Sequence, residues 1–276
     1  MISPRKGFIR SLLMAAALTI SATGFSIEGR AQADRGGMPG DFDHYILALS
    51  WSPTYCNGRG GEGESDRGQY DGWDRGAGPS DGRQGSSGRG SDQQCSGERP
   101  YAFVLHGLWP QYDRRGWPEF CQSSNRPWVP EETVDGMMDI MPSRRLVIQE
   151  YRKHGICSGL DPRQYFDAAR KAFRSVRIPE QLQDLSQPLS VSPEALRKAF
   201  LEVNPQLTPD MIQIVCSRNL LRELRICFTK DLAPRSCSQN EQNRRLCTFS
   251  TVTMPPVRGG GTGPHGYPSS GRRDSL

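Results

Sequence analysis

The chain has 276 residues, of which 35% are hydrophobic, with 30 glycines, 21 prolines and a net charge of +5. The first 33 residues carry four basic and one acidic side chain, so the rest of the chain is near +2. This length is sufficient for one sizeable core. So weak a positive charge does not by itself indicate a nucleic-acid-binding protein, since that class carries a strongly basic face.

Residues 1–33 have the pattern of a secretory signal peptide. A basic start precedes a short apolar stretch at 11–25, and the sequence AQA at 31–33 puts small residues where a signal peptidase reads. The apolar stretch is too short for a membrane anchor, and a buried apolar helix is the alternative. We expect an exported protein, periplasmic or secreted, that begins at Asp34 and has no later membrane span.

All eight cysteines follow this segment. An even number in an exported chain indicates disulfides, and the absence of a CxxC pair makes a structural zinc site the weaker interpretation. Composition alone leaves on the order of a hundred possible pairings. The cysteines are Cys56, Cys95, Cys121, Cys157, Cys216, Cys227, Cys237 and Cys247.

Two segments differ in composition from the rest. Residues 57–98 are dominated by Gly, Ser, Asp and Arg and contain almost no aliphatic side chains, so they cannot bury enough surface to offset their ordering. We expect a solvated loop, closed at its base by Cys56 and Cys95, with a binding role as the alternative. Residues 254–276 are expected to form a disordered tail, which leaves one domain at 34–253.

Four segments of this domain have strand patterns. The first is a nearly continuous apolar run at 45–51, and 101–106 and 211–217 are similar. The last, 220–229, alternates apolar and polar residues as a half-buried strand does.

Helices are expected between these strands. Residues 143–155 begin at Ser143 and are closed by Gly155, while Asp161-Pro162 and Ser192-Pro193 are typical helix starts. Strands at both ends with helices between them predict an α+β domain on an antiparallel sheet.

The two histidines of interest are His106 and His154, since His44 at a strand edge and His265 in the tail fit ordinary roles. His106 ends the second strand, and the following glycine lets the backbone turn. Its simpler interpretation is a hydrogen-bonded histidine at the margin of the core.

His154 closes the helix that begins at Ser143. Glu150 and Lys153 precede it by four residues and one, so all three share one patch of the helix. A solvated, charged helix end is the alternative.

Taken together, these residues suit the cleavage of RNA by its own 2′-hydroxyl. One neutral imidazole takes the hydroxyl proton, a protonated one gives a proton to the leaving oxygen, and a cation stabilises the phosphorane. The substrate supplies the nucleophile, and the sequence has no evident metal cluster, so we expect no cofactor.

Two segments carry a resemblance to a known family. FVLHGLWP at 103–110 and EYRKHG at 150–155, followed by Cys157, resemble the two active-site segments of the ribonuclease T2 family. The likeness extends from ALSWSPTYC at 48–56 to the last cysteine. It implies an α+β fold with a central antiparallel β-sheet flanked by helices.

The resemblance also implies roles for individual residues. His106 would be the general acid and a phosphate contact, and His154 the general base on the 2′-hydroxyl; the reverse division of these two roles stays open. Glu150 and Lys153 would bind the phosphate and stabilise the pentacoordinate state. Trp109 would line the site beside the base or ribose.

The cysteines fit the same family. Cys121–Cys157 would hold the two segments in register, and Cys216–Cys247 and Cys227–Cys237 resemble the C-terminal pairs of the family. Cys56–Cys95 then remains as the fourth pair.

Base preference is open, because this sequence departs from the family pattern at Ser50, Gln149 and Tyr151. Tyr112 and Trp117 are candidates for stacking on a base, with ordinary packing as the alternative for each.

The sequence thus predicts an exported, monomeric, metal-independent endoribonuclease acting on single-stranded RNA. It would form 2′,3′-cyclic phosphates and hydrolyse them to 3′-phosphates. The alternatives are a catalytically silent RNA-binding homologue and a metal-dependent phosphodiesterase.

Overall fold

The computed structural model describes most of the predicted domain, and its residues from Ala33 onward belong to one compact unit. The predicted signal peptide beyond Met1, most of the predicted loop and most of the predicted tail, with His265, lie outside the described residues. The described ranges are 33–60, 93–96, 99–114, 116–123, 127–242 and 246–257, with Met1.

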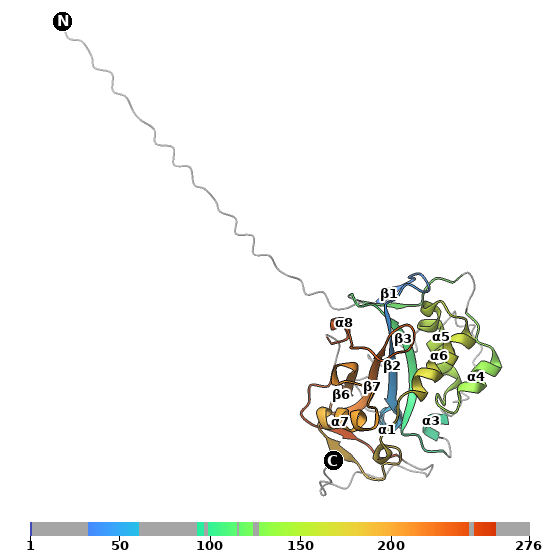
Figure 1. Ribbon diagram of the computed structural model, residues 1–276, viewed down its shortest axis with the longest axis vertical. Helices are drawn as coiled ribbons and strands as arrows, with labels where there is room; N and C mark the ends of the chain where they lie inside the picture. The colour runs from blue at the N-terminus through green and yellow to red at the C-terminus, as the bar shows by residue number, and fades with distance from the viewer. Residues whose placement is uncertain are drawn as a thin grey trace. The chain divides into compact units, whose positions relative to one another are not determined.

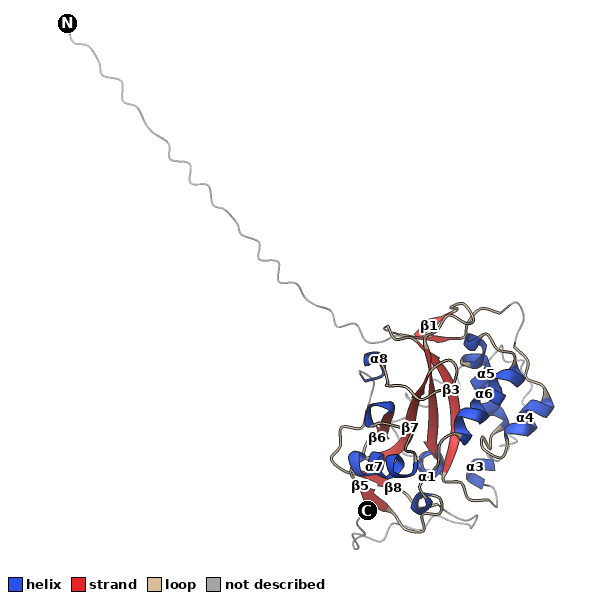
Figure 2. Ribbon diagram, in the orientation of Figure 1, coloured by secondary structure: helices blue, strands red, loops and turns tan. Residues whose placement is uncertain are grey.

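The centre of the fold is an antiparallel sheet (Figures 1 and 2). Strand β2 (His44–Trp51) pairs with β3 (Phe103–Gln111) on one side and with β7 (Leu220–Phe228) on the other. The sheet is completed by β6 (Ile212–Ser217), β8 (Val252–Met254) and β5 (Leu189–Val191). Here β8 meets β7 in parallel, and the other strand pairs are antiparallel. A separate parallel pair joins β1 (Ala33–Arg35) to β4 (Trp117–Glu119). The predicted α+β architecture is confirmed.

The helices begin where the sequence predicts. The side chains of Ser143, Asp161 and Ser192 each accept a hydrogen bond from a backbone N–H three residues on. The helices are α1 (Ser52–Gly60), α3 (Gln93–Ser96), α4 (Glu131–Met137), α5 (Arg144–Lys153), α6 (Pro162–Arg174), α7 (Pro193–Val203) and α8 (Gln239–Gln242). Short 3-10 turns are η1 (Gly155–Ser158), η2 (Glu180–Leu182) and η3 (Pro209–Met211).

The main core lies on the face of the sheet that the larger helices cover. Side chains of α4, α5, α6 and α7 pack there against alternate residues of β2, β3 and β7. Phe103 makes edge-to-face contacts with Trp51 and with Phe200, with ring centroids 5.0 and 5.6 Å apart. The opposite face carries a smaller apolar cluster of Ile46, Ala48, Trp109, Cys227 and Cys237. The functional side chains gather on this second face.

Strand β7 differs from its prediction as a half-buried strand. Its apolar residues are buried, but Glu223 and Cys227 of the alternate set are buried as well. Neighbouring side chains and the Cys227–Cys237 disulfide cover the second face of the sheet. The polar residues that alternate along β7 therefore face an enclosed site and not solvent.

Three predicted boundaries also need correction. Gly155 does not close α5 with a left-handed turn: the helix ends at Lys153 and the chain continues into η1. The domain extends beyond 253, because Trp51 donates a hydrogen bond to the carbonyl of Pro255 and Val257 is buried. Both ends of the predicted loop are helical, in α1 and α3.

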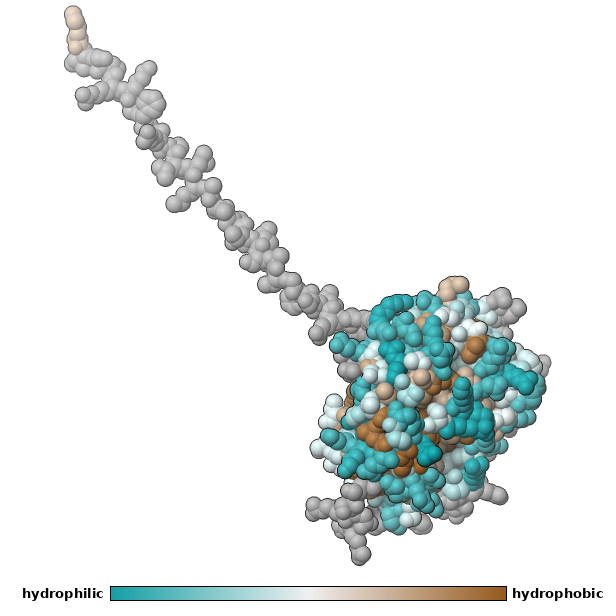
Figure 3. Space-filling model, in the orientation of Figure 1, coloured by the Kyte–Doolittle hydropathy of each residue, from teal (hydrophilic) through white to brown (hydrophobic). Residues whose placement is uncertain are grey.

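The structure contains the four disulfides that were expected. They are Cys56–Cys95, Cys121–Cys157, Cys216–Cys247 and Cys227–Cys237. Hydrophilic side chains cover most of the face shown in Figure 3, with a smaller hydrophobic area near its centre. Within the described ranges, no helix has the length and apolar character to cross a membrane.

Candidate active site

His106 lies within strand β3 at a bulge, and not at the end of the strand as predicted. The β2–β3 register passes from Leu49 opposite Leu105 to Ala48 opposite Gly107, so His106 is the extra residue. The imidazole follows Leu105 in the alternation, lies on the second face of the sheet and is 15% exposed. The extra residue shifts the alternation after it, so Trp109, three positions on, lies on the same face as His106.

Gly107 is needed for space and not for a turn. A Cβ atom here would lie 2.1 Å from Oε2 of Glu150 and 2.4 Å from Nε1 of Trp109. The bare backbone thus allows the carboxylate of helix α5 to lie directly against strand β3. This contact brings the two predicted segments together.

Glu150 is fully buried, yet it is not fully paired. Its Oε2 accepts a hydrogen bond from Nε1 of Trp109 at 2.7 Å, while its Oε1 lies 3.8 Å from Nε2 of His106. Oε1 accepts no hydrogen bond within the described part of the chain. Burial raises the pKa of Glu150 to about 7, against the opposing effects of His106, Trp109 and Lys153. The carboxyl group can therefore change protonation near neutral pH.

Trp109 lies between the two histidines. Its ring is 5.1 Å from that of His106 and 5.4 Å from that of His154, centroid to centroid. The indole is itself buried, and the guanidinium of Arg225 lies 5.0 Å from its ring. The structure thus gathers His106, Trp109, Glu150 and His154 into one cluster.

The end of α5 places Lys153 and His154 beside this cluster. Lys153 lowers the pKa of Glu150, and its Nζ lies 3.5 Å from Oε2 of Glu119. His154 is the C-cap of the helix and is 4% exposed. The Cys121–Cys157 disulfide fastens the following turn to the segment after β4. The four predicted catalytic side chains therefore share one region.

Glu223 is a site residue that sequence reasoning missed. Its Oε1 lies 3.0 Å from Nδ1 of His106, and its Oε2 accepts two hydrogen bonds from Arg225 at 2.8 and 2.6 Å. Burial alone would raise the pKa of Glu223, but Arg225, Arg222 and His106 hold it well below its ordinary value. The only sequence signal was an acid and a base alternating with apolar residues in one strand.

The two candidate stacking residues differ in the structure. Tyr112 is 2% exposed within the main core, its hydroxyl bonds Asp34 at 3.1 Å, and Arg114 lies over its ring. It offers no open face to a base, so packing replaces the stacking hypothesis. Trp117 is half-buried in β4 and stays a candidate.

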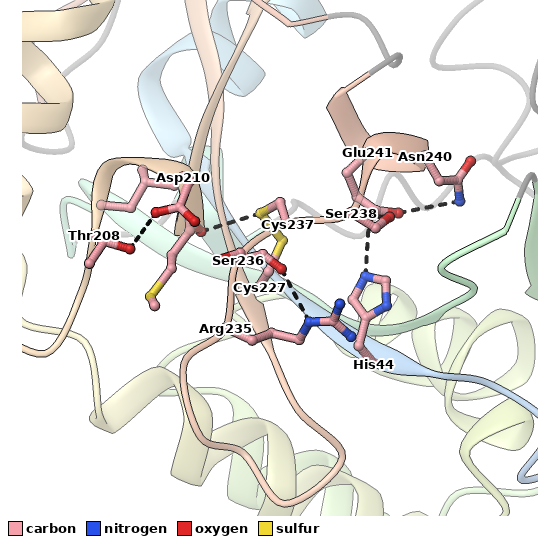
Figure 4. Close-up of a disulfide and its surroundings, with 12 residues drawn as sticks. His44, Thr208, Asp210, Cys227, Arg235, Ser236, Cys237, Ser238, Asn240 and Glu241 are labelled. Carbon is pink, nitrogen blue, oxygen red and sulfur yellow. Dashed lines mark hydrogen bonds and ion pairs between the residues drawn. A yellow bond between two sulfur atoms is a disulfide. The ribbon is translucent and has the colours of Figure 1, made fainter.

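A second histidine lies between two carboxylates elsewhere in the fold. His44 is fully buried at the start of β2, with Asp113 3.1 Å from its Nδ1 and Glu241 3.2 Å from its Nε2. Figure 4 shows His44 pointing at Glu241 of α8, near the Cys227–Cys237 disulfide. This cluster ties α8 to the central sheet, which agrees with the ordinary role expected for His44.

No group of three or more His, Cys, Asp or Glu side chains in the described ranges is arranged to hold a metal ion. The groups that the site itself supplies are two imidazoles, two buried carboxylates and an ammonium group.

Comparison with known proteins identifies the family of the chain. The model of the ribonuclease T2 family matches residues 42–237. The chain is 30% identical over 213 residues to a ribonuclease of Aeromonas hydrophila, an alignment that covers 76% of this chain and 83% of that one. It is 29% identical over 199 residues to a probable ribonuclease of Haemophilus influenzae, covering 71% of this chain and 61% of that relative. The chain thus spans less than two thirds of the Haemophilus protein.

A solved structure supports the fold. The RNase-related protein from Calystegia sepium aligns with a TM-score of 0.55 at 18% identity, covering 79% of this chain and 98% of that one.

Proposed function

The chain belongs to the ribonuclease T2 family of RNA-cleaving enzymes, and we propose that it is a metal-independent endoribonuclease acting on single-stranded RNA. It would cut by transphosphorylation to 2′,3′-cyclic phosphate ends and then hydrolyse these ends to 3′-phosphates. The observation that carries this proposal is that both histidines lie against Trp109, while the buried Glu150 of helix α5 lies against Gly107 of strand β3.

In the first step, His154 takes the proton of the 2′-hydroxyl, which attacks the adjacent phosphorus. His106 gives its proton to the departing 5′-oxygen, so the bond from phosphorus to that oxygen breaks as the new one forms. In the second step the roles reverse: His106 takes a proton from water and His154 returns one to the 2′-oxygen. Proton transfer of this kind typically contributes about 10²–10⁴-fold to the rate for each group.

Lys153 and Glu150 act on the phosphorane in this scheme. The ammonium of Lys153 offsets the charge that develops on the phosphoryl oxygens. Glu150, with its pKa near neutrality, can donate a hydrogen bond to such an oxygen when protonated, through the oxygen that faces His106. Trp109 fixes the carboxyl by its hydrogen bond to the other oxygen.

Four disulfides and bacterial ribonuclease relatives are typical of a protein that works in the periplasm or outside the cell. We propose that residues 1–33 are the signal peptide that exports it and that the mature chain is a monomer. Mass spectrometry of the exported protein should give an N-terminus at Asp34.

The activity is tested with a defined single-stranded RNA and the same sequence as DNA, each incubated with the mature protein in excess EDTA. The expected result is RNA cut to 2′,3′-cyclic phosphate ends, identified by mass spectrometry, with DNA intact. Activity that disappears in EDTA and returns with a metal would contradict the proposal. Absence of cleavage under all conditions would indicate a binding protein.

A further inference from the structure

Glu223 reaches His106 from two strands away. Strand β2 lies between them, and strands in a sheet are about 4.8 Å apart, so β3 and β7 are separated by roughly 10 Å. The intervening residues on this face are the small Ala48 and Ser50, which lie opposite Arg225 and Glu223. They leave the room across which the imidazole and the carboxylate meet at 3.0 Å.

The two oxygens of Glu223 have different partners. Oε2 is held by Nε and Nη2 of Arg225, and Oε1 faces His106 and, at 3.5 Å, Nε of Arg222. Both arginines are always cationic and can only donate hydrogen bonds. They hold the buried carboxylate in its ionised form and fix its orientation toward the imidazole.

An ionised carboxylate accepts hydrogen bonds and cannot donate them. The hydrogen in the contact must therefore sit on Nδ1 of His106, which leaves Nε2 as the nitrogen that exchanges protons with the substrate. Nε2 is also the nitrogen that faces Oε1 of Glu150, on the side where the phosphate is expected. The geometry thus fixes both the tautomer and the direction of the ring.

We propose that Glu223 is a positioning residue of the reaction, which accepts the Nδ1 hydrogen of His106 and presents Nε2 to the leaving oxygen. This role rests on the proposed ribonuclease mechanism. During transfer the proton passes from Nε2 to the 5′-oxygen, while Glu223 keeps its charge and takes no proton. A carboxylate behind a catalytic histidine acts in this way in serine proteases.

The charged groups that face His106 come from two elements. Glu223, with Arg222 and Arg225 behind it, lies on β7, and Glu150, with Lys153 near it, lies on α5. Glu223 contacts Nδ1 of the ring, whereas Glu150 lies on the Nε2 side. Substitution of Glu223 therefore changes the Nδ1 side of the ring and leaves the α5 side in place.

Glu223→Gln is the variant that tests the role. The amide oxygen should turn to the two arginines, because they only donate, and the amide NH₂ group would then face Nδ1. That arrangement favours the opposite tautomer, with the hydrogen on Nε2. We expect kcat on RNA to fall by about 10–100-fold, with KM within about threefold of wild type.

The matched control is Glu241→Gln. Glu241 is also a fully buried carboxylate beside a histidine ring, but its partner is His44, four residues and roughly 13 Å along β2 from Ala48. This variant should lose stability and keep kcat. Glu223→Asp, which keeps the carboxylate, should recover part of the lost rate.

Two further measurements separate positioning from a structural effect. Nitrogen NMR of the wild-type protein at alkaline pH, with His106→Ala used to assign the ring, should show neutral His106 protonated on Nδ1. In the His106→Ala background, Glu223→Gln should cause no additional loss of kcat, because it acts through a ring that is gone.

The inference is overturned if folded Glu223→Gln keeps kcat within threefold of wild type, or if its effect multiplies with that of His106→Ala. If Glu223→Gln does not fold, the wild-type tautomer decides, and neutral His106 protonated on Nε2 overturns the role. His106→Ala in the same assay separates the two proposals. An active His106→Ala enzyme contradicts the proposed function itself, whereas an inactive one beside a fully active Glu223→Gln enzyme contradicts only this inference.

Discussion

In the described part of the chain, His106 and His44 each lie between two carboxylates, and the proposed mechanism uses the first of them. His106 contacts Glu223 and Glu150, and His44 contacts Asp113 and Glu241. The first ring is 15% exposed and the second is completely buried. In this account, the same pair of residue types serves the proposed reaction in one place and holds α8 to the sheet in the other.

The difference lies in what surrounds each carboxylate. Near His106, Oε1 of Glu150 accepts no hydrogen bond in the described part of the chain, and burial raises the pKa of this carboxyl to about 7. Near His44, Glu241 accepts a hydrogen bond from Ser238, and Arg235 pairs with Asp113. In the cluster that we propose to be catalytic, one oxygen of Glu150 is available to a substrate, whereas the carboxylates of Glu241 and Asp113 accept hydrogen bonds from the protein.

The largest expected effect is the loss of activity in His106→Ala. Removal of the general acid should lower kcat on RNA by about 10²–10⁴-fold, and His154→Ala should do the same. Both proteins should remain folded by circular dichroism, because these rings lie at the edge of the core. Near-normal kcat in either variant would contradict a catalytic role for the histidine that it lacks.

The converse is expected of His44→Ala. Loss of this ring leaves Glu241 buried beside a cavity, so the free energy of unfolding should fall by about 3–5 kcal/mol, measured in urea. The kcat of the folded fraction should equal that of wild type. A variant of normal stability but low activity would mean that the two clusters do not divide their roles in this way.

Glu150→Gln should lower activity and raise stability. The pKa of Glu150 rises from its ordinary 4.5 to about 7 on folding, so the folded state holds the proton more tightly than the unfolded state. The resulting stability is complete below about pH 4 and is lost as pH rises to about 7. Above pH 7 the variant should therefore be more stable than wild type by on the order of 3 kcal/mol, with little difference at pH 4.

Urea unfolding of both proteins at pH 4 and pH 8 checks this dependence. If Glu150→Gln and wild type have the same free energy of unfolding at pH 8 as well as at pH 4, the ionised carboxylate of Glu150 costs nothing to bury, which contradicts this prediction.

The smallest effects are expected at the two aromatic residues. Tyr112→Phe removes the hydrogen bond to Asp34 and should cost about 1 kcal/mol of stability, with no change in KM for RNA. Trp117→Ala should raise KM by about tenfold if its ring stacks on a base. Steady-state kinetics on a short RNA distinguish them, and a raised KM in Tyr112→Phe would restore the stacking role that its burial argues against.

The sequence predicted the residues that form local patterns. The start signals at Ser143, Asp161 and Ser192 begin helices in the structure, and the two recognisable segments contain His106 and the α5 cluster. The sequence pointed to Gly107 as a turn, whereas the structure requires glycine there for space. That requirement could not be predicted, because the close approach of Glu150 depends on how α5 packs against β3.

The features that were missed depend on pairing between distant segments. The bulge at His106 exists only in the register with β2, and no local pattern reveals it. Glu223 looked like the solvent side of a strand, because alternation cannot tell an enclosed polar face from an exposed one. For Tyr112 the sequence left base stacking and ordinary packing open, and the structure encloses its ring in the core.

The most direct test of the central claim uses a DNA oligonucleotide that contains a single ribonucleotide, with the wild-type and His106→Ala proteins compared in excess EDTA. The account predicts one cut by wild type, on the 3′ side of the ribonucleotide, with a 2′,3′-cyclic phosphate on the product and no cut by the variant. Cleavage at deoxynucleotides, or equal cleavage by the variant, would contradict a mechanism in which His106 moves a proton for the 2′-hydroxyl of the substrate.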